Sequence, residues 1–145
     1  MKKAEQDVYG DVVRSSLRTI TQRSAKEMKI PQKYFTACST GKVDVLKEFL
    51  EKGVPPESRD SNGLTGLIWA GRKGRIEIAD ILLQNGADLE TGDVRKRTAL
   101  FHAVTYQRYD FVEHLIEKGA NINPIDTHGW TPIDFSRTSR HKKMV

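Results

Sequence analysis

Cysteine and long apolar runs are what this sequence has least of. Its 145 residues include one cysteine, Cys38, so no disulfide can form within one copy of the chain. No stretch approaches the roughly 18 consecutive apolar residues of a membrane-spanning helix. The start, MKKAEQDVYGDVV, lacks the apolar core and small-residue cleavage site of a secretory signal. We therefore expect an intracellular protein without a membrane span, in the cytoplasm or, as the alternative, in the nucleus.

Patterns that would indicate catalysis are also missing. The chain has no Gly-rich phosphate loop of the Walker or dinucleotide type. Its four histidines have no metal-site spacing and no cysteine pair to join them: His102, His114, His128 and His141. Cys38 stands where we expect a small buried residue, without an evident base. We therefore predict a protein that is not an enzyme and that needs no cofactor or metal.

The sequence does contain a repeat with a period of 33 residues. Three of its positions keep one residue type: Asp60, Asp93 and Asp126; Thr65, Thr98 and Thr131; Gly53, Gly86 and Gly119. A fixed period of roughly 20 to 50 residues indicates a solenoid of stacked units, none of which can bury its apolar face alone. We expect the threonines to cap helices, and each aspartate to organise its own turn through local hydrogen bonds.

The repeated stretches resemble ankyrin repeats. TGLIWA, TALFHA and TPIDFS, which begin at Thr65, Thr98 and Thr131, are similar to the T-P-L-H-x-A signature. GADL from Gly86 and GANIN from Gly119 resemble the G-A-D-V-N that ends an ankyrin unit. The resemblance covers residues 31–145 and implies an all-α solenoid of three full helix-turn-helix repeats and a partial fourth. Its units are expected at 31–59, 60–92, 93–125 and 126–145, with first helices over 32–40, 65–73, 98–106 and 131–139.

Two departures from the family pattern stand out. The signature histidine is replaced by Ile68, Phe101 and Asp134, so its hydrogen bond to the preceding threonine should be absent. Gln107 takes the place of Gly41 and Gly74 between the two helices of a unit. A non-glycine residue in a left-handed turn costs roughly 1 kcal/mol, so we expect strain there.

The two ends of the chain differ from the body. Residues 1–33 carry a net charge of +4, residues 34–130 of −2, and residues 131–145 of +3. In the basic segment 1–30, apolar residues recur near helical spacing: Val8, Val12, Val13, Leu17 and Ile20. Three interpretations stay open for it: a helix that caps the first repeat, an amphipathic helix for a membrane surface or a partner, and a disordered arm.

The C-terminal end matches the start of a second helix. On the repeat, Lys142, Met144 and Val145 correspond to Ile76, Ile78 and Ala79. The chain should therefore stop about four residues into that helix, although terminal repeats normally carry a polar capping face. We expect either a longer chain or an assembly in which a partner completes the array.

The resemblance implies that a protein partner binds across a concave side, formed by the turn tips and the exposed positions of the first helices. The residues at these positions are Leu64, Trp69, Arg72, Lys73, Arg95, Arg97, His102, Tyr106, His128 and Trp130. Trp, Tyr and Arg are the types that dominate interface energetics. We predict an adaptor or scaffold whose partner is acidic. Trp69 could instead fill the groove between repeats, and the basic tip could be a solvated turn.

Nucleic-acid or anionic-surface binding is the alternative function. It would use the basic ends and two clusters, Arg72–Arg75 and Arg95–Arg97. The nearly balanced body and the lack of a regular row of stacking aromatic residues favour a protein partner.

Overall fold

The computed structural model describes residues 30–144, and their side chains up to residue 138. The predicted basic segment thus lies outside the described residues except for Ile30, and its three interpretations stay predictions. Seven helices follow: α2 (Gln32–Thr40), α3 (Val43–Glu51), α4 (Gly66–Lys73), α5 (Ile76–Gln84), α6 (Ala99–Thr105), α7 (Tyr109–Glu117) and α8 (Pro132–Met144).

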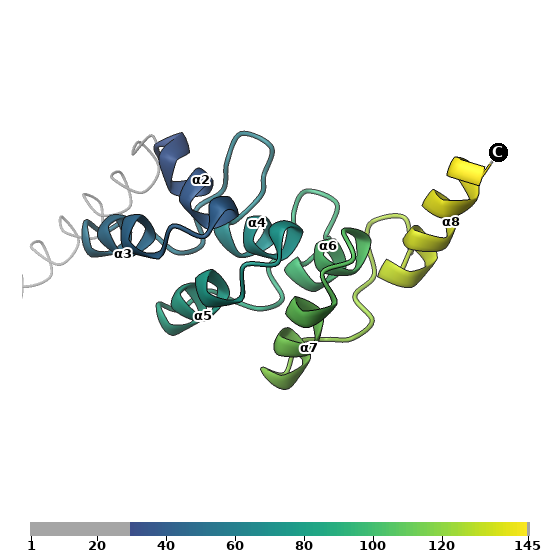
Figure 1. Cartoon of the computed structure of the whole chain (residues 1–145). Helices are drawn as coiled ribbons and strands as arrows, with labels where there is room; N and C mark the ends of the chain where they lie inside the picture. Colours follow the sequence, from purple (N-terminus) through teal and green to yellow (C-terminus); the bar gives the residue numbers. More distant parts are fainter. Residues whose placement is uncertain (1–29, 145) are drawn as a thin grey trace, which may run out of the picture. The chain divides into compact units, whose positions relative to one another are not determined.

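These helices form the predicted all-α stack of helical pairs. The first helices α2, α4, α6 and α8 make one row in which each packs on the next, and α3, α5 and α7 make a second row (Figure 1). The loops that join one pair to the next project to one side as tips (Figure 1). The three observed first helices of the full units begin and end within one residue of the predicted ranges.

Small residues let the first helices approach one another. Ala37, Ala70 and Ala103 are buried at equivalent positions. A Cβ atom added at Gly71 would lie 2.7 Å from the carbonyl oxygen of Ala99, so α4 and α6 pack too closely there for any other residue. Cys38 is buried as expected, and burial raises the pKa of its thiol to about 12, which makes it unreactive.

Threonine caps begin the first helices of the last three units. The Oγ1 atoms of Thr65 and Thr98 accept from the backbone N–H groups of Ile68 and Phe101, at 3.2 and 3.3 Å. Thr131 also donates its hydroxyl to Asp134 Oδ2, at 2.8 Å, and accepts from the Asp134 N–H. The signature side-chain bond is therefore not lost everywhere, because in the fourth unit a carboxylate replaces the histidine.

The turn between α6 and α7 has the predicted left-handed backbone. Gln107 has a φ of 60°, where Gly41 and Gly74 have 78° and 72°. Lys96 has a φ of 62° at the tip position of Gly63 and Gly129. This second left-handed site was not predicted, although the glycines 33 residues on either side of Lys96 indicate it.

Helix α8 corrects the prediction for the C-terminal end. Instead of a first helix over 131–139, a turn and the start of a second helix, one helix runs from Pro132 to Met144. Arg140 occupies the turn position of Gly41 and Gly74. A non-glycine residue disfavours the left-handed backbone of this turn, and at Arg140 the chain stays helical instead.

Leu82 and Leu115 hold equivalent positions in α5 and α7, and both are 0% exposed. Replacing either by alanine should lower the free energy of unfolding by roughly 2–5 kcal/mol, because it leaves a cavity between layers. Urea unfolding followed by circular dichroism measures this change. Ile122→Ala, at a side chain 59% exposed, is the control and should cost less than about 0.5 kcal/mol. A comparably small loss at either leucine would contradict the repeat register.

Replacing Gln107 by glycine should stabilise the fold. Glycine removes the left-handed strain but adds freedom to the unfolded chain, so the expected net gain is about 0.5–1 kcal/mol. The same substitution at Gln84, an exposed helical residue that ends α5, should destabilise by a similar amount. Urea unfolding measures the change in the free energy of unfolding of both variants. A loss of stability in Gln107→Gly would show that the turn is not strained.

Candidate partner-binding face

One aspartate closes each of the three tips. The Oδ1 atom of Asp60 accepts from the backbone N–H groups of Asn62 and Leu64, both at 2.9 Å. Asp93 makes the same pair of bonds with residues 95 and 97, and Asp126 makes it with residues 128 and 130. These carboxylates organise their own turns, as predicted.

The second oxygen of each aspartate fastens the tip to neighbouring structure. Trp69 donates its indole N–H to Asp60 Oδ2 at 2.8 Å. His102 Nε2 lies 2.8 Å from Asp93 Oδ2. The equivalent residue in the last unit, Phe135, has no donor. Arg97 of the preceding tip takes its place, with its Nε and Nη2 atoms 3.2 and 3.1 Å from Asp126 Oδ2.

Burial and hydrogen bonding act against each other at these acids. Burial raises the pKa of Asp126, but the N–H groups of Trp130 and His128 and the Arg97 guanidinium outweigh it and hold that pKa below its usual value. Burial lowers the pKa of His102, the Asp93 carboxylate opposes this, and Arg72 and Arg97 lower the pKa further. His102 is therefore a neutral imidazole near pH 7, which donates from Nε2 to the ionised Asp93.

Arginines and aromatic rings alternate along the first helices. The Cζ atom of Arg72 lies 4.7 Å from the ring centroid of Trp69 and 4.8 Å from that of Tyr106, whose hydroxyl also accepts from Arg72 Nη2. The Cζ atom of Arg97 lies 5.2 Å from the Phe101 centroid and 4.4 Å from the Phe135 centroid. Each such contact stabilises by about 0.5–2 kcal/mol, depending on burial. The two guanidinium groups are thus held in fixed positions.

The ten predicted contact residues fall into three groups. Lys73, Arg95, Tyr106, His128 and Trp130 are exposed, and Trp69, Arg72, Arg97 and His102 are half-buried. Leu64 corrects the prediction: at 6% exposure it is part of the core at the base of its tip and is not available to a partner. Trp69 and His102 fasten tips and also border the exposed surface, so their role as contacts stays a prediction.

Two family models match this chain. One, for ankyrin repeats in three copies, matches residues 34–93, and another, for ankyrin repeats in many copies, matches residues 72–136. The chain belongs to the ankyrin-repeat family. No curated protein matches it. None of the helices in the described part is long and apolar enough to cross a membrane.

Arginines also tie one ankyrin unit to the next at the opposite end from the tips. Arg75 and Arg108 hold equivalent positions, and their Nε atoms donate to the carbonyl oxygens of Ser39 and Arg72, both at 3.0 Å. Each side chain lies over a glycine of the preceding unit, Gly41 or Gly74. Arg75, predicted as part of a basic cluster, therefore has a structural bond that the sequence analysis missed.

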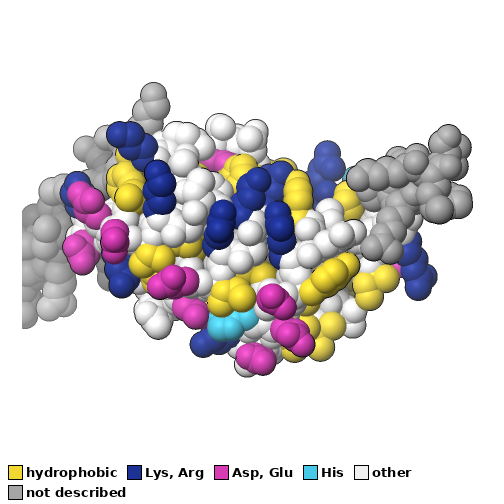
Figure 2. Space-filling model, viewed as in Figure 1, with side chains coloured by type: hydrophobic (Ala, Val, Ile, Leu, Met, Phe, Trp, Pro, Cys, Tyr) yellow, Lys and Arg dark blue, Asp and Glu magenta, His cyan; other side chains and the backbone are white. Residues whose placement is uncertain are grey.

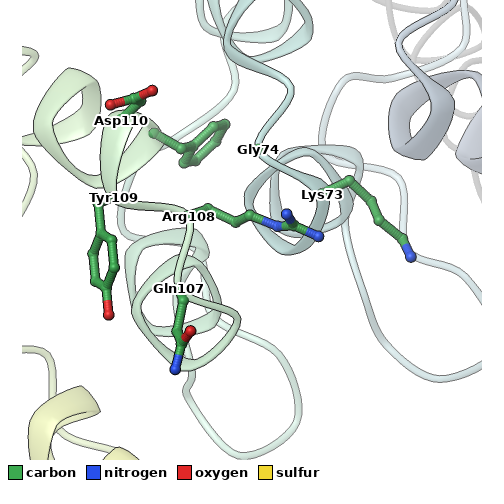
Figure 3. A pocket seen from close by; sticks show the side chains of 7 residues that line it. Lys73, Gly74, Gln107, Arg108, Tyr109 and Asp110 are labelled. Atoms are coloured by element: carbon green, nitrogen blue, oxygen red, sulfur yellow. The ribbon is translucent and has the colours of Figure 1, made fainter.

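A hollow of about 340 Å³ opens beside the Arg108 tie, lined by Lys73, Gly74 and residues 107–111. Figure 3 shows Arg108 reaching towards the Gly74 turn, with Tyr109 on one side of it and Lys73 on the other. The lining is mixed in charge, because Asp110 faces this space together with the two cations. The described part of the chain holds no group of three His, Cys, Asp or Glu side chains that could bind a metal ion.

Charge is divided between the two rows of helices in the ankyrin array. The first helices α2, α4 and α6 contain Lys33, Arg72 and Lys73 and no acidic residue. The second helices contain one lysine, Lys47, and eight acids: Asp44, Glu48, Glu51, Glu77, Asp80, Asp110, Glu113 and Glu117. In Figure 2, Lys and Arg gather over the upper middle of this view and Asp and Glu follow its lower edge, where Figure 1 places α5 and α7. The net charge of residues 34–130 is small, but the acidic residues of their helices all lie in the second row.

Replacing Asp126 by asparagine tests the fastening of the last tip. The change removes the charge that Arg97 meets and should lower the free energy of unfolding at pH 7 by about 1.5–3 kcal/mol. The pKa of Asp126 is lower in the folded chain than its unfolded value of about 3.9, so its stabilisation is present above about pH 4 and is lost as the pH falls through the folded pKa.

The variant should consequently lose less stability than the wild type between about pH 4 and pH 2. Urea unfolding at a series of pH values measures both effects. Glu113→Gln, at an exposed carboxylate of α7, is the control and should change stability at pH 7 by less than about 0.5 kcal/mol. If the free energy of unfolding fell equally in wild type and Asp126→Asn between about pH 4 and pH 2, Asp126 would not be the group that stabilises the tip.

Proposed function

We propose that this ankyrin array is an adaptor or scaffold that binds an acidic segment of another protein across its inner face. The inner face is the surface formed by the tips at 60–64, 93–97 and 126–130 together with α4 and α6. Ankyrin repeats are in general protein-interaction modules. The observation that carries the proposal is the segregation of charge, which leaves the first helices α2, α4 and α6 without acids and the second helices α3, α5 and α7 rich in them.

Rigidity supports the same proposal. The tip aspartates and the stacked guanidinium groups fix most polar side chains of the inner face before any partner arrives. Side chains that are already ordered lose little conformational entropy on binding, so more of the contact energy becomes affinity.

Exposed side chains on the inner face supply the contact area. Tyr106 and Trp130 are 43% and 37% exposed, and Val94 at the second tip is 76% exposed. Lys73 and Arg95 are exposed as well. Aromatic anchors with charged neighbours are typical of interface hot spots, in which rings set how long a complex lasts and charges set how fast it forms.

Nucleic-acid binding is the weaker candidate. Of the arginines in its predicted clusters, Arg75 is bonded to Ser39, Arg97 to Asp126, and Arg72 to Tyr106. The acidic second helices would repel a phosphate backbone that wrapped around the array. Steep loss of affinity with salt, as expected for several phosphate contacts, would favour this candidate.

A photo-crosslinker placed at His128 on the inner face should capture the partner from cell extract, and the same group at Glu113 on α7 should not. Both positions are exposed, so the pair differs only in the side of the array. Mass spectrometry identifies the captured protein. Equal capture at the two positions would contradict the proposed face.

Charge reversal then tests steering with the identified partner. Arg95→Glu should slow association by roughly three- to tenfold and reduce its salt dependence, because it reverses charge at an exposed tip. Lys47→Glu makes the same change on α3 and should have little effect. Arg97 is unsuitable for this test because its loss would leave Asp126 buried without its partner. Surface-binding kinetics measure the rates, and an equal effect of both variants would count against the inner face.

A further inference from the structure

Arg72 differs from the other half-buried donors of the inner face, Trp69, His102 and Arg97, because no carboxylate pairs with it. Trp69 meets Asp60, His102 meets Asp93 and Arg97 meets Asp126. Among the described residues, Arg72 forms no ion pair, and its one side-chain hydrogen bond goes to the Tyr106 hydroxyl. The tip aspartates nearest to it already use both of their oxygens in the bonds described above.

The Arg72 guanidinium is also partly removed from water. The residue is half-buried, and its Nε atom is fully buried without a hydrogen-bond partner. A cation withdrawn from water without a counter-charge is costly. The rings of Trp69 and Tyr106 offset part of this cost by lying within 5 Å of the Cζ atom. The guanidinium of Arg72 is therefore held in place, and no carboxylate of the described residues pairs with it.

Two further cations are close to Arg72 in the sequence or bonded to its backbone. Lys73 follows Arg72 at the end of α4 and is exposed, and Arg108 bonds to the Arg72 carbonyl oxygen from the next unit. His102 is neutral, and the proximity of Arg72 contributes to its lowered pKa. An arriving carboxylate therefore meets no acid on α4 or α6.

We propose that Arg72 is the receptor for a glutamate or aspartate side chain of the acidic partner segment, with Trp69 and Tyr106 as its walls. This inference rests on the proposed function and deepens it. A planar guanidinium pairs well with the two oxygens of a carboxylate. The flanking rings of Trp69 and Tyr106 offer apolar surface to the methylene groups of such a side chain.

The probe is a fluorescein-labelled, ten-residue glutamate peptide at low salt, followed by fluorescence anisotropy. A ten-residue glutamine peptide is the uncharged control, and a ten-nucleotide thymidine strand supplies phosphates without carboxylates. In a Trp130→Phe background, the emission of Trp69 reports binding at the site itself. The glutamate peptide should bind and change that emission, and the glutamine peptide should do neither.

Two variants that remove the same charge locate the receptor. Arg72→Gln should weaken binding of the glutamate peptide by about tenfold or more, and Lys47→Gln, at an exposed position of α3 outside the inner face, by about twofold or less. Arg72→Lys keeps the charge but loses the planar guanidinium that donates two hydrogen bonds to a carboxylate. It should therefore still weaken binding by several-fold. Circular dichroism and thermal melts check that each variant is folded. If Arg72→Gln does not fold, the test uses Arg72→Lys in its place.

Three results would overturn the inference. Equal losses for Arg72→Gln and Lys47→Gln would mean that binding depends only on the total charge of the protein. Binding without a change in Trp69 emission would place the receptor elsewhere. Failure of the glutamate peptide to bind, or tighter binding of the thymidine strand, would exclude a carboxylate receptor. The crosslinking pair at His128 and Glu113 tests the inner face separately, so the proposed function can survive any of these results.

Discussion

The array depends on one small constraint, an aspartate that starts each tip and uses both of its oxygens. One oxygen closes the turn through two backbone N–H groups, and the other binds a side chain outside the turn. A tip would otherwise be a short loop with few apolar contacts, which is the kind of segment that opens first in a protein. The last unit shows how strong the requirement is: Phe135 offers no donor, and Arg97 reaches across from the neighbouring unit to supply one.

Hydrogen bonds between units also decide which cations are available for function. Arginines that tie one unit to the next, such as Arg75, Arg97 and Arg108, belong to the scaffold even where they reach the surface. Net charge and clusters in the sequence cannot separate them from Arg72, Lys73 and Arg95. The structure separates them by their partners. Among the described residues, the side chains of Arg72, Lys73 and Arg95 bond to no carboxylate or backbone carbonyl of another unit, and the second helices are acidic. Such an arrangement favours a short acidic protein segment over a long polyanion.

Much of the fold follows from the period of 33 residues, because each unit repeats the same caps, small residues and apolar stripe. Helix limits, the threonine caps, the tip aspartates, the buried Cys38 and the strained Gln107 could all be predicted in this way. Three features could not. Helix α8 continues through the turn position, which holds Arg140 where earlier units have glycine. Leu64 is buried by packing at the base of the tip, and the Arg75 and Arg108 ties require the distance between units, which no spacing reveals.

The third unit carries both of the strained residues, and this links the fold to the candidate site. Lys96 and Gln107 are the only non-glycine residues with positive φ in the described part of the chain, and both belong to residues 93–125. The same unit supplies Arg95, His102 and Tyr106. Backbone strain of about 1 kcal/mol or more persists where something offsets it, and it gathers at functional sites. Glycine would remove the strain, but it would also delete a cation from the second tip and an amide from the rim of the hollow beside Lys73. The two strained residues therefore lie in the same unit as three of the candidate contact residues, Arg95, His102 and Tyr106.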